Sequence, residues 1–386
     1  MLLNYSEGLK DIRGKATGFN NVAGVYRQWG KYELALEYFQ KALEIDEKLK
    51  DIRGKATRLN NIGSVYQDWG KLQQALEYFQ KALEIDEELK DIKGEATRLN
   101  NIAGVYQDCG KLQQALEYFQ KALEIDEKLK DIRGKATRLN NIGIVYQQWG
   151  KPEQALEYFQ KALEIDEELK DIRRKAIDFI NIGSVYQDCG KPGKALEYFQ
   201  KALEIDEELK DIRGKATRLN NIGIVYQQWG MPEQALGYFQ NALEIDEELK
   251  DIRGKAIRFN NIGIVYQQWE KLQQALEYFQ KALEMAQELK DIRGKVTRLN
   301  NIAGVYQDWG KPEKALEYFQ KALEIDEELK DIRGKATRLN NIGIVYQDWG
   351  KYGKALEYFQ KSLKLFEELK DAENIAGIMK NIKNLT

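Results

Sequence analysis

A six-residue pattern that recurs every forty residues is the feature that most constrains the fold of this chain. Asp-Ile-Arg-Gly-Lys-Ala or a close variant of it begins each copy. Tandem copies of one short unit predict a stack in which each copy packs only against its neighbours. The sequence therefore predicts nine repeats and no separate globular domain. Their bounds are 11–50, 51–90, 91–130, 131–170, 171–210, 211–250, 251–290, 291–330 and 331–370.

Each repeat is predicted to form two helices, as repeat 211–250 illustrates. Within 214–229 apolar residues recur at steps of three and four, the spacing of one face of an α-helix. Asp211 is placed to cap this first helix and Gly230 to end it. A second amphipathic stretch covers 232–249. Two short antiparallel helices cannot bury both apolar faces alone, so the hairpins are expected to stack into an all-α solenoid.

Composition agrees with this fold and excludes several function classes. The chain has only 4 prolines in 386 residues, and 60 basic residues nearly balance 62 acidic ones. A protein that binds nucleic acid through phosphate contacts needs a basic excess, and a membrane helix needs about 18 consecutive apolar residues. We therefore expect no nucleic-acid and no membrane partner. The small number of cysteines, 2 in all, is typical of a reducing compartment and predicts a cytoplasmic protein.

The repeats also resemble those of the tetratricopeptide repeat (TPR) family. Small and aromatic residues of repeat 211–250 fall on that family's characteristic positions; they are Gly223, Tyr226, Gly230, Ala235, Phe239 and Ala242. Two positions depart from the family pattern, because Leu219 stands at the usual first-helix tryptophan and Glu247 at the usual terminal proline. Losing that proline lets the second helix continue, which fits a forty-residue repeat.

The longer repeats containing Leu-Asn-Asn-Ile are similar to those of kinesin light chains, Pins-type adaptors and prokaryotic TPR arrays. This resemblance implies a right-handed solenoid of nine tandem hairpins. It also implies that the first helices line a concave groove for an extended or helical peptide of a partner protein.

The two ends of the chain differ from the repeats. Residues 1–10 match only the tail of a second helix, so we expect a partial repeat there; a chain cut from a longer array or protein is one explanation of such a start and is left open. Residues 371–386 match only the start of a first helix and are predicted to form a capping helix. Its apolar stripe would be Ile375, Ile378, Met379 and Ile382, with Lys380, Asn381, Lys383 and Asn384 facing outward.

No group of residues suggests catalysis. The chain has no histidine, which removes the commonest general base and metal ligand. Cys109 and Cys189 stand where the other repeats have tryptophan, and equivalent positions two repeats apart are too distant for a disulfide. The acidic residues near Asp246 recur in seven repeats and are expected to form a solvated outer face. We therefore expect no enzyme, no catalytic residue, no metal and no cofactor.

A polar stripe along the first helix is the candidate binding surface. Asparagine costs about half a kcal/mol against alanine in a helix, yet nearly every repeat keeps two adjacent asparagines, as at Asn220 and Asn221. One explanation is structural, with amides on adjacent first helices bonded to each other or to neighbouring backbone. The other is functional, with a ladder of amides that holds the backbone of a bound peptide.

Variation between repeats is concentrated in the same stripe. The position of Ile224 alternates between isoleucine, glycine and serine, so its isoleucines either contact a ligand or tighten the packing between repeats. First helices are basic, which favours a partner with apolar anchors and some acidic residues. The predicted partner-binding residues are Asn60, Asn100, Asn140, Asn220, Asn260, Asn300, Asn340, Asn221, Asn261, Ile144, Ile224, Ile264, Ile344, Gln228 and Gln268.

Three functional hypotheses follow from these features. The first is a protein–protein interaction scaffold that binds a peptide segment in the groove of first helices. The second is a sensor or regulatory array cut from a larger effector protein. The third is a self-assembling solenoid, because nearly identical repeats can stack end to end without closing into a ring. A protein that reads RNA is the least favoured class, since the near-neutral charge attracts phosphates weakly.

Overall fold

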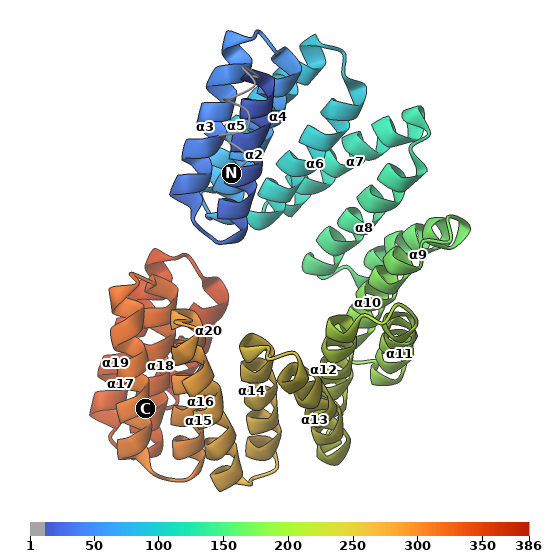
Figure 1. Ribbon diagram of the computed structural model, residues 1–386. Coiled ribbons are helices and arrows are strands. Elements are labelled where there is room, and N and C mark those ends of the chain that lie inside the picture. The colour runs from blue at the N-terminus through green and yellow to red at the C-terminus, as the bar shows by residue number, and fades with distance from the viewer. Residues whose placement is uncertain (1–11, 386) are drawn as a thin grey trace. The chain divides into compact units, whose positions relative to one another are not determined.

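The computed structural model describes residues 12–385, and this range contains helices but no strand (Figure 1). The chain divides into two compact units, an N-terminal unit of residues 1–191 and a C-terminal unit of residues 192–386. The helices of the N-terminal unit are α2 (Ile12–Gln28), α3 (Tyr32–Lys48), α4 (Ile52–Asp68), α5 (Leu72–Glu88), α6 (Ile92–Asp108), α7 (Leu112–Leu129), α8 (Ile132–Gln148), α9 (Pro152–Glu168) and α10 (Ile172–Asp188).

The C-terminal unit continues the same alternation of first and second helices. Its helices are α11 (Pro192–Glu208), α12 (Ile212–Gln228), α13 (Pro232–Glu248), α14 (Ile252–Gln268), α15 (Leu272–Glu288), α16 (Ile292–Asp308), α17 (Pro312–Glu328), α18 (Ile332–Asp348), α19 (Tyr352–Glu368) and α20 (Ala372–Lys383). The partial repeat expected at 1–10 lies outside the described residues.

Local sequence signals fix the first helices. The carboxylate of Asp211 accepts a hydrogen bond from the backbone N–H of Gly214 at 2.9 Å, which caps α12. Gly230 follows this helix with φ of 74°, a conformation in which a side chain would be strained. Both predicted end signals are confirmed, and Pro232 opens α13 where its missing N–H is not needed.

Each second helix is followed by a lysine in the left-handed conformation, which the sequence does not predict. Lys250, which follows α13, has φ of 53° although it is not glycine. Its N–H donates to the carbonyl of Glu247 at 3.1 Å, and the N–H of Asp251 donates to the carbonyl of Asp246 at 2.8 Å. These bonds satisfy carbonyl groups left free at the helix end and thereby stabilise the left-handed lysine. Lysine occupies this place in every described repeat; the residues are Lys50, Lys90, Lys130, Lys170, Lys210, Lys250, Lys290, Lys330 and Lys370.

The two helices of a hairpin pack through a glycine and an aromatic ring. A Cβ atom on Gly263 in α14 would lie 2.7 Å from the ring of Phe279 in α15, so this ring approaches the glycine more closely than it could approach an alanine without a shift. Phe279 is fully buried in consequence. Tyr266 and Tyr278 stack beside it with ring centroids 5.4 Å apart.

Successive hairpins are joined through an apolar core between a second helix and the next first helix. Phe239 and Leu243 of α13 form one core cluster with Ile262 and Val265 of α14. Successive first helices, such as α12 and α14 or α14 and α16, also contact each other directly. Each unit is therefore a continuous stack of helical hairpins, which confirms the all-α solenoid predicted from the repeats.

The last helix, α20, packs on α19 with only part of its expected stripe. Ile378 is 3% exposed and joins the core cluster of Phe359 and Phe366. Met379, in contrast, is 58% exposed, because the next residue on a helix points about 100° away from its predecessor. Asn381 was expected to face outward but is half-buried, and its amide donates to Oδ1 of Asn340 at 3.4 Å.

Candidate partner-binding surface

A ladder of asparagine side chains joins successive first helices. The first asparagine of each pair and its equivalents form the Asn220 series, and the second form the Asn221 series. Nδ2 of Asn261 donates to Oδ1 of Asn220 at 2.8 Å, and Asn301 donates to Asn260 at the same distance. The same bond joins Asn61 to Asn20, Asn101 to Asn60, Asn141 to Asn100, Asn181 to Asn140, and Asn341 to Asn300.

This ladder gives the recurrent asparagines a structural role. A net gain of about 0.5–1.5 kcal/mol per hydrogen bond is enough to offset the cost of asparagine within a helix. Arg338 adds a second donor to Oδ1 of Asn300 at 2.7 Å. Asn140 and Asn220 are buried, with 9% and 7% of their surface exposed, whereas the other predicted asparagines are half-buried. The structural explanation is thus present in the geometry, and contact with a ligand stays a prediction for the half-buried amides.

A second polar ladder runs along the C-terminal ends of the first helices. Nε2 of Gln227 donates to Oε1 of Gln268 at 3.2 Å, and Gln307 donates to a carboxylate oxygen of Asp348 at 2.7 Å. Equivalent contacts join Arg27 to Asp68, Gln67 to Asp108, Gln107 to Gln148, Gln147 to Asp188, and Gln267 to Asp308. The predicted site residues Gln228 and Gln268 are both exposed, so this edge of the surface is open to solvent.

The isoleucines of the predicted site lie between the two ladders. All four are half-buried, and Ile224 packs against the core cluster that joins α13 to α14. Ile264 and Ile344 pack against the equivalent clusters further along the C-terminal unit. Where serine replaces them, as at Ser64, the hydroxyl donates to the carbonyl four residues earlier on the same helix. Packing between repeats is therefore shown, and contact with a ligand through the remaining exposed surface stays a prediction.

Buried ion pairs neutralise much of the positive charge of the first helices. Nε of Arg258 lies 3.0 Å from a carboxylate oxygen of Asp246, and both residues are less than 10% exposed. Asp246 was expected on a solvated outer face, and that expectation is wrong for this residue. Burial raises the pKa of its carboxyl, and the charge of Arg258 only partly opposes this effect. Equivalent pairs are Asp46–Arg58, Asp86–Arg98, Asp126–Arg138, Asp206–Arg218 and Asp326–Arg338.

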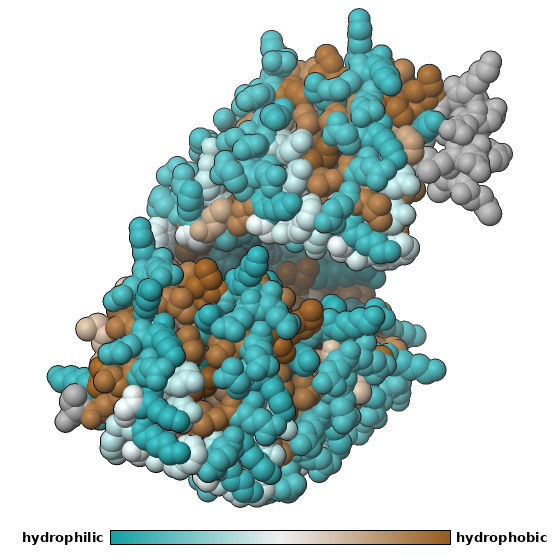
Figure 2. All heavy atoms as spheres, turned by 90° about the vertical axis from the view of Figure 1, so that its left-hand side faces the viewer, coloured by the Kyte–Doolittle hydropathy of each residue, from teal (hydrophilic) through white to brown (hydrophobic). Residues whose placement is uncertain are grey.

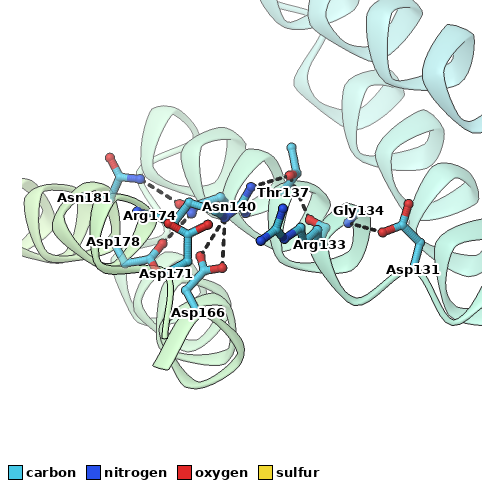
Figure 3. A network of polar contacts seen from close by, with 10 residues as sticks. All are labelled: Asp131, Arg133, Gly134, Thr137, Asn140, Asp166, Asp171, Arg174, Asp178 and Asn181. Atoms are coloured by element: carbon cyan, nitrogen blue, oxygen red, sulfur yellow. Dashed lines mark hydrogen bonds and ion pairs between the residues drawn. The ribbon is translucent and has the colours of Figure 1, made fainter. Parts of the chain in front are cut away.

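Repeat 171–210 rearranges this ion pair (Figure 3). Asp178 replaces the usual arginine, and Arg174 replaces the usual glycine. Nε of Arg174 donates to Asp166 at 2.9 Å, so the charge reaches the same acceptor from a position four residues earlier. Asp178 is left fully buried, where Nδ2 of Asn140 donates to it. Burial is the main cause that raises the pKa of Asp178 to about 7.

Exposed isoleucines at the starts of the first helices were not anticipated. Ile212 follows the capping aspartate and is 50% exposed. Its half-exposed equivalents are Ile12, Ile52, Ile92, Ile132, Ile292 and Ile332. The recurrent Asp-Ile dipeptide was the available signal, but helical spacing alone assigns this residue to the buried face. On the face shown in Figure 2, apolar residues form separate patches among hydrophilic ones.

The described residues set limits on other kinds of site. No helix within 12–385 combines the length and the hydropathy that crossing a bilayer requires. In the same range no three His, Cys, Asp or Glu side chains come together as a metal site would need. Cys109 and Cys189 are both free thiols, as their spacing predicts.

Comparison with known proteins identifies the repeat. The tetratricopeptide repeat family model matches residues 15–88, 95–168, 177–248, 233–288 and 295–368. The chain belongs to the tetratricopeptide repeat family. TPR repeats commonly mediate protein–protein interaction, so the family places this chain among interaction proteins. A search of curated protein sequences finds no match.

Several solved structures share the fold at low sequence identity. A STAND protein with a TPR sensor from Pyrococcus horikoshii is 17% identical with a TM-score of 0.59, and the match covers 90% of this chain and 54% of that one. A Rap protein complexed with competence and sporulation factor is 17% identical with a TM-score of 0.54, covering 97% and 100%. Aspartyl phosphate phosphatase F from Bacillus subtilis is 18% identical with a TM-score of 0.55, covering 91% and 93%.

Proposed function

We propose that this TPR chain is a scaffold that binds an extended or helical peptide segment of a protein partner along its first helices. The observation that carries the proposal is the contrast within that surface. Two polar ladders hold successive first helices in register, while the residues between and beside them change from repeat to repeat. A surface whose framework is fixed and whose contact residues vary is suited to specific recognition, because little order is lost on binding.

The proposed contacts are the half-buried asparagines, the isoleucines and the exposed glutamines of the first helices. Ile224 and Ile264 stand on consecutive first helices and would supply adjacent apolar contacts. Amides such as those of Asn260 and Asn261 retain donors and acceptors beyond the ladder bonds, and these suit the backbone of an extended peptide. The Rap protein of similar fold, which was solved with competence and sporulation factor, supports a partner held by such an array.

The expected charge of the partner follows from the arginines that are not part of the buried ion pairs. Arginines such as Arg258 are buried with their aspartates, so they add little to the surface field. The exposed arginines next to the capping aspartates, such as Arg213 and Arg253, remain at the surface. We therefore propose a partner with apolar anchors and some acidic residues. Its acidic residues would lie against the N-terminal ends of the first helices, where these arginines are exposed.

The test uses substitutions that the repeats themselves already contain. Random peptides displayed on phage are selected against the full chain and then measured against a variant with Ile224→Ser and Ile264→Ser. Serine occupies the equivalent position at Ser64 and Ser184, so the variant is expected to fold. Losing apolar contact from two isoleucines should weaken the selected peptides by about tenfold or more.

A matched control removes exposed apolar surface from a second helix. Leu356 in α19 is 36% exposed, and Leu356→Ser should leave peptide affinity unchanged. The proposal fails if no peptide is enriched, or if the enriched peptides bind the double isoleucine variant as tightly as the native chain. Circular dichroism of each variant shows whether the helices are intact.

A further inference from the structure

Two equivalent cavities lie between successive repeats in the C-terminal unit, at the turns that join first to second helices. The first has a volume of about 240 Å³ and is lined by Gln227, Gly230, Pro232, Val265, Gln268 and Trp269. The second has a volume of about 350 Å³ and is lined by Gln307, Gly310, Pro312, Glu313, Val345, Asp348 and Trp349. Each is bounded by the proline of one repeat and the tryptophan of the next, and we call it a Pro–Trp notch.

Other repeat boundaries show what fills the equivalent space. At the place of Pro232 the first repeat has Tyr32, whose ring stacks on Trp69 with centroids 5.8 Å apart and planes at 29°. Between the two notches the same place is held by Leu272, which packs with Trp309 on one core cluster. Proline has a shorter side chain than either residue, which leaves room for the cavities beside Pro232 and Pro312. The chain thus contains its own example of an aromatic ring seated on this tryptophan.

We infer that the two Pro–Trp notches are binding sockets for aromatic side chains of the peptide partner, seated as Tyr32 is on Trp69. This inference rests on the proposed function and deepens it by naming the anchoring side chains. Cavities of 240 and 350 Å³ lie below and near the lower end of the range of about 300–1,000 Å³ that is usual for ligand sites, and each is large enough for one aromatic side chain. The two cavities are two repeats apart, with Leu272 at the equivalent place between them, so the two anchors would enter two repeats apart.

The sockets are continuous with the proposed binding surface. Gln268 lines the first socket and also accepts the ladder bond from Gln227. In the second socket Gln307 donates to Asp348 in the same way. A peptide that follows the first helices therefore passes the mouths of both sockets.

Each socket has a tryptophan held in place by its own repeat. The ammonium group of Lys271 lies 3.2 Å from the ring centroid of Trp269, and that of Lys351 lies 3.0 Å from Trp349. A cation placed over the ring restricts the indole and leaves less order to be lost on binding. The second socket alone is lined by the carboxylates of Glu313 and Asp348, so a basic residue beside the second aromatic anchor is favoured.

The experiment uses the full chain and N-acetyl-tyrosinamide as the probe. Nuclear magnetic resonance of the tryptophan indole N–H groups follows each socket separately, with assignments made by single Trp→Phe substitutions. The Trp269 and Trp349 signals should shift saturably with a dissociation constant on the order of 1 mM, whereas the Trp309 signal should not. Trp309 is the internal control, because Leu272 stands at the place of proline there and packs on the same core cluster as Trp309.

Exchanging the filling residues should move the sockets. Pro232→Leu should remove the response of Trp269, and Pro312→Leu that of Trp349. Leu272→Pro should make the Trp309 signal respond to the probe. Proline is already the first residue of four second helices, so this variant is expected to fold. If it does not fold, Leu272→Ala takes its place. Pro152→Leu is the matched control, because Cys189 stands at the tryptophan position of the following repeat and neither signal should change.

Two results would overturn the inference. One is the absence of saturable shifts at Trp269 and Trp349 in a chain with a native helical spectrum. The other is an equal response of Trp309 in the native chain, which would indicate non-specific contact with indoles. This experiment can fail separately from the peptide selection. If peptides are enriched but neither socket responds, the scaffold function stands and the sockets for aromatic side chains are wrong. If the sockets respond but no peptide is enriched, the sockets bind aromatic side chains and the scaffold function is wrong.

Discussion

Asp178 occupies an environment that no equivalent residue of another repeat shares. It is fully buried, its neighbours are Asp166, Arg174 and the amide of Asn140, and burial raises its pKa to about 7. The ordinary pKa of an aspartate in an unfolded chain is about 3.9. Between these values the folded chain retains a proton that the unfolded chain has released. The stability of this region is therefore highest below about pH 4 and falls as the pH rises towards 7.

Asp178→Asn should remove this pH dependence. The amide cannot ionise, so the variant is expected to exceed the native chain in stability at pH 7 by a few kcal/mol, about 1.4 kcal/mol per unit of pKa difference. The advantage should shrink towards pH 4. Urea unfolding of both chains at pH 4, 5.5 and 7 (about 1.5 units apart) measures it. Glu168→Gln, at an exposed carboxylate nearby, is the control, and a pH-independent difference for Asp178→Asn would contradict the prediction.

Arg298 stands at the position of Arg258 and of the other first-helix arginines that form buried ion pairs. Among the described arginines at this position it alone lacks its aspartate, because Ala286 stands where Asp246 stands in the preceding second helix. Its Nε has no hydrogen-bond partner, and burial lowers the pKa of its guanidinium. Ala286→Asp should restore the pair and stabilise the chain by about 1.5–3 kcal/mol. Chemical denaturation measures the gain, with Ala286→Asn as the uncharged control. Equal effects of the two substitutions would show that the charge is irrelevant.

Residues with local signals could be predicted from the sequence, and residues defined by the next repeat could not. Asp211 and Gly230 act on their own helix, and the structure confirms both. Asp246 was misassigned to the surface because its burial depends on Arg258 in the following repeat. The left-handed Lys250 depends on two backbone bonds that form only when the helix end closes. Neighbouring repeats were equally decisive for the Pro–Trp notches, which no single repeat contains.

At the scale of the helices, the asparagine ladder predicts how first helices are held together. Asn300 accepts from Asn341 at 3.0 Å and from Arg338 at 2.7 Å. Asn300→Ala leaves both donors without this acceptor, while the helix gains about half a kcal/mol in propensity. We expect a net loss of about 1–2 kcal/mol in the free energy of unfolding, measured by urea denaturation.

A matched substitution separates the acceptor from the rest of the side chain. Asn300→Asp keeps an oxygen that can accept from Asn341 and Arg338, so it should lose less stability than the alanine variant. If alanine at this position is neutral or stabilising, the ladder contributes nothing to the stack. The recurrent asparagines would then need the functional explanation alone.

The positions of the helices were largely predictable from the sequence. Which first-helix residues pack against the next repeat, and which are available to a ligand, was not. First helices were predicted within 214–229 and observed as Ile212–Gln228 in α12, because capping and periodicity are local properties. Asn220 and Ile224 could contact either a ligand or the next first helix. The distance between successive first helices decides between the two, and a single sequence does not give that distance. The structure shows contacts to the next helix for both.

At the scale of the molecule, stability should be distributed locally along each unit. Within the C-terminal unit the helices pack mainly on the helices beside them in sequence, with smaller contacts between successive first helices such as α12 and α14. In such a stack a destabilising change acts mainly on the changed repeat and its neighbours. The sequence predicted this behaviour because the repeats are nearly identical and no linker separates them.

Ile302→Ala tests this local distribution. Ile302 is fully buried in the core between α15, α16 and α17, and removing its side chain beyond Cβ should cost about 2–5 kcal/mol. Backbone hydrogen exchange followed by mass spectrometry should then show faster exchange in α15 to α17, with little change in α12 and α13. The exposed substitution Ile292→Ala on the same helix is the control. Equal acceleration in all helices of the C-terminal unit would show that it unfolds as one cooperative block, and local coupling between neighbouring repeats would be the wrong description.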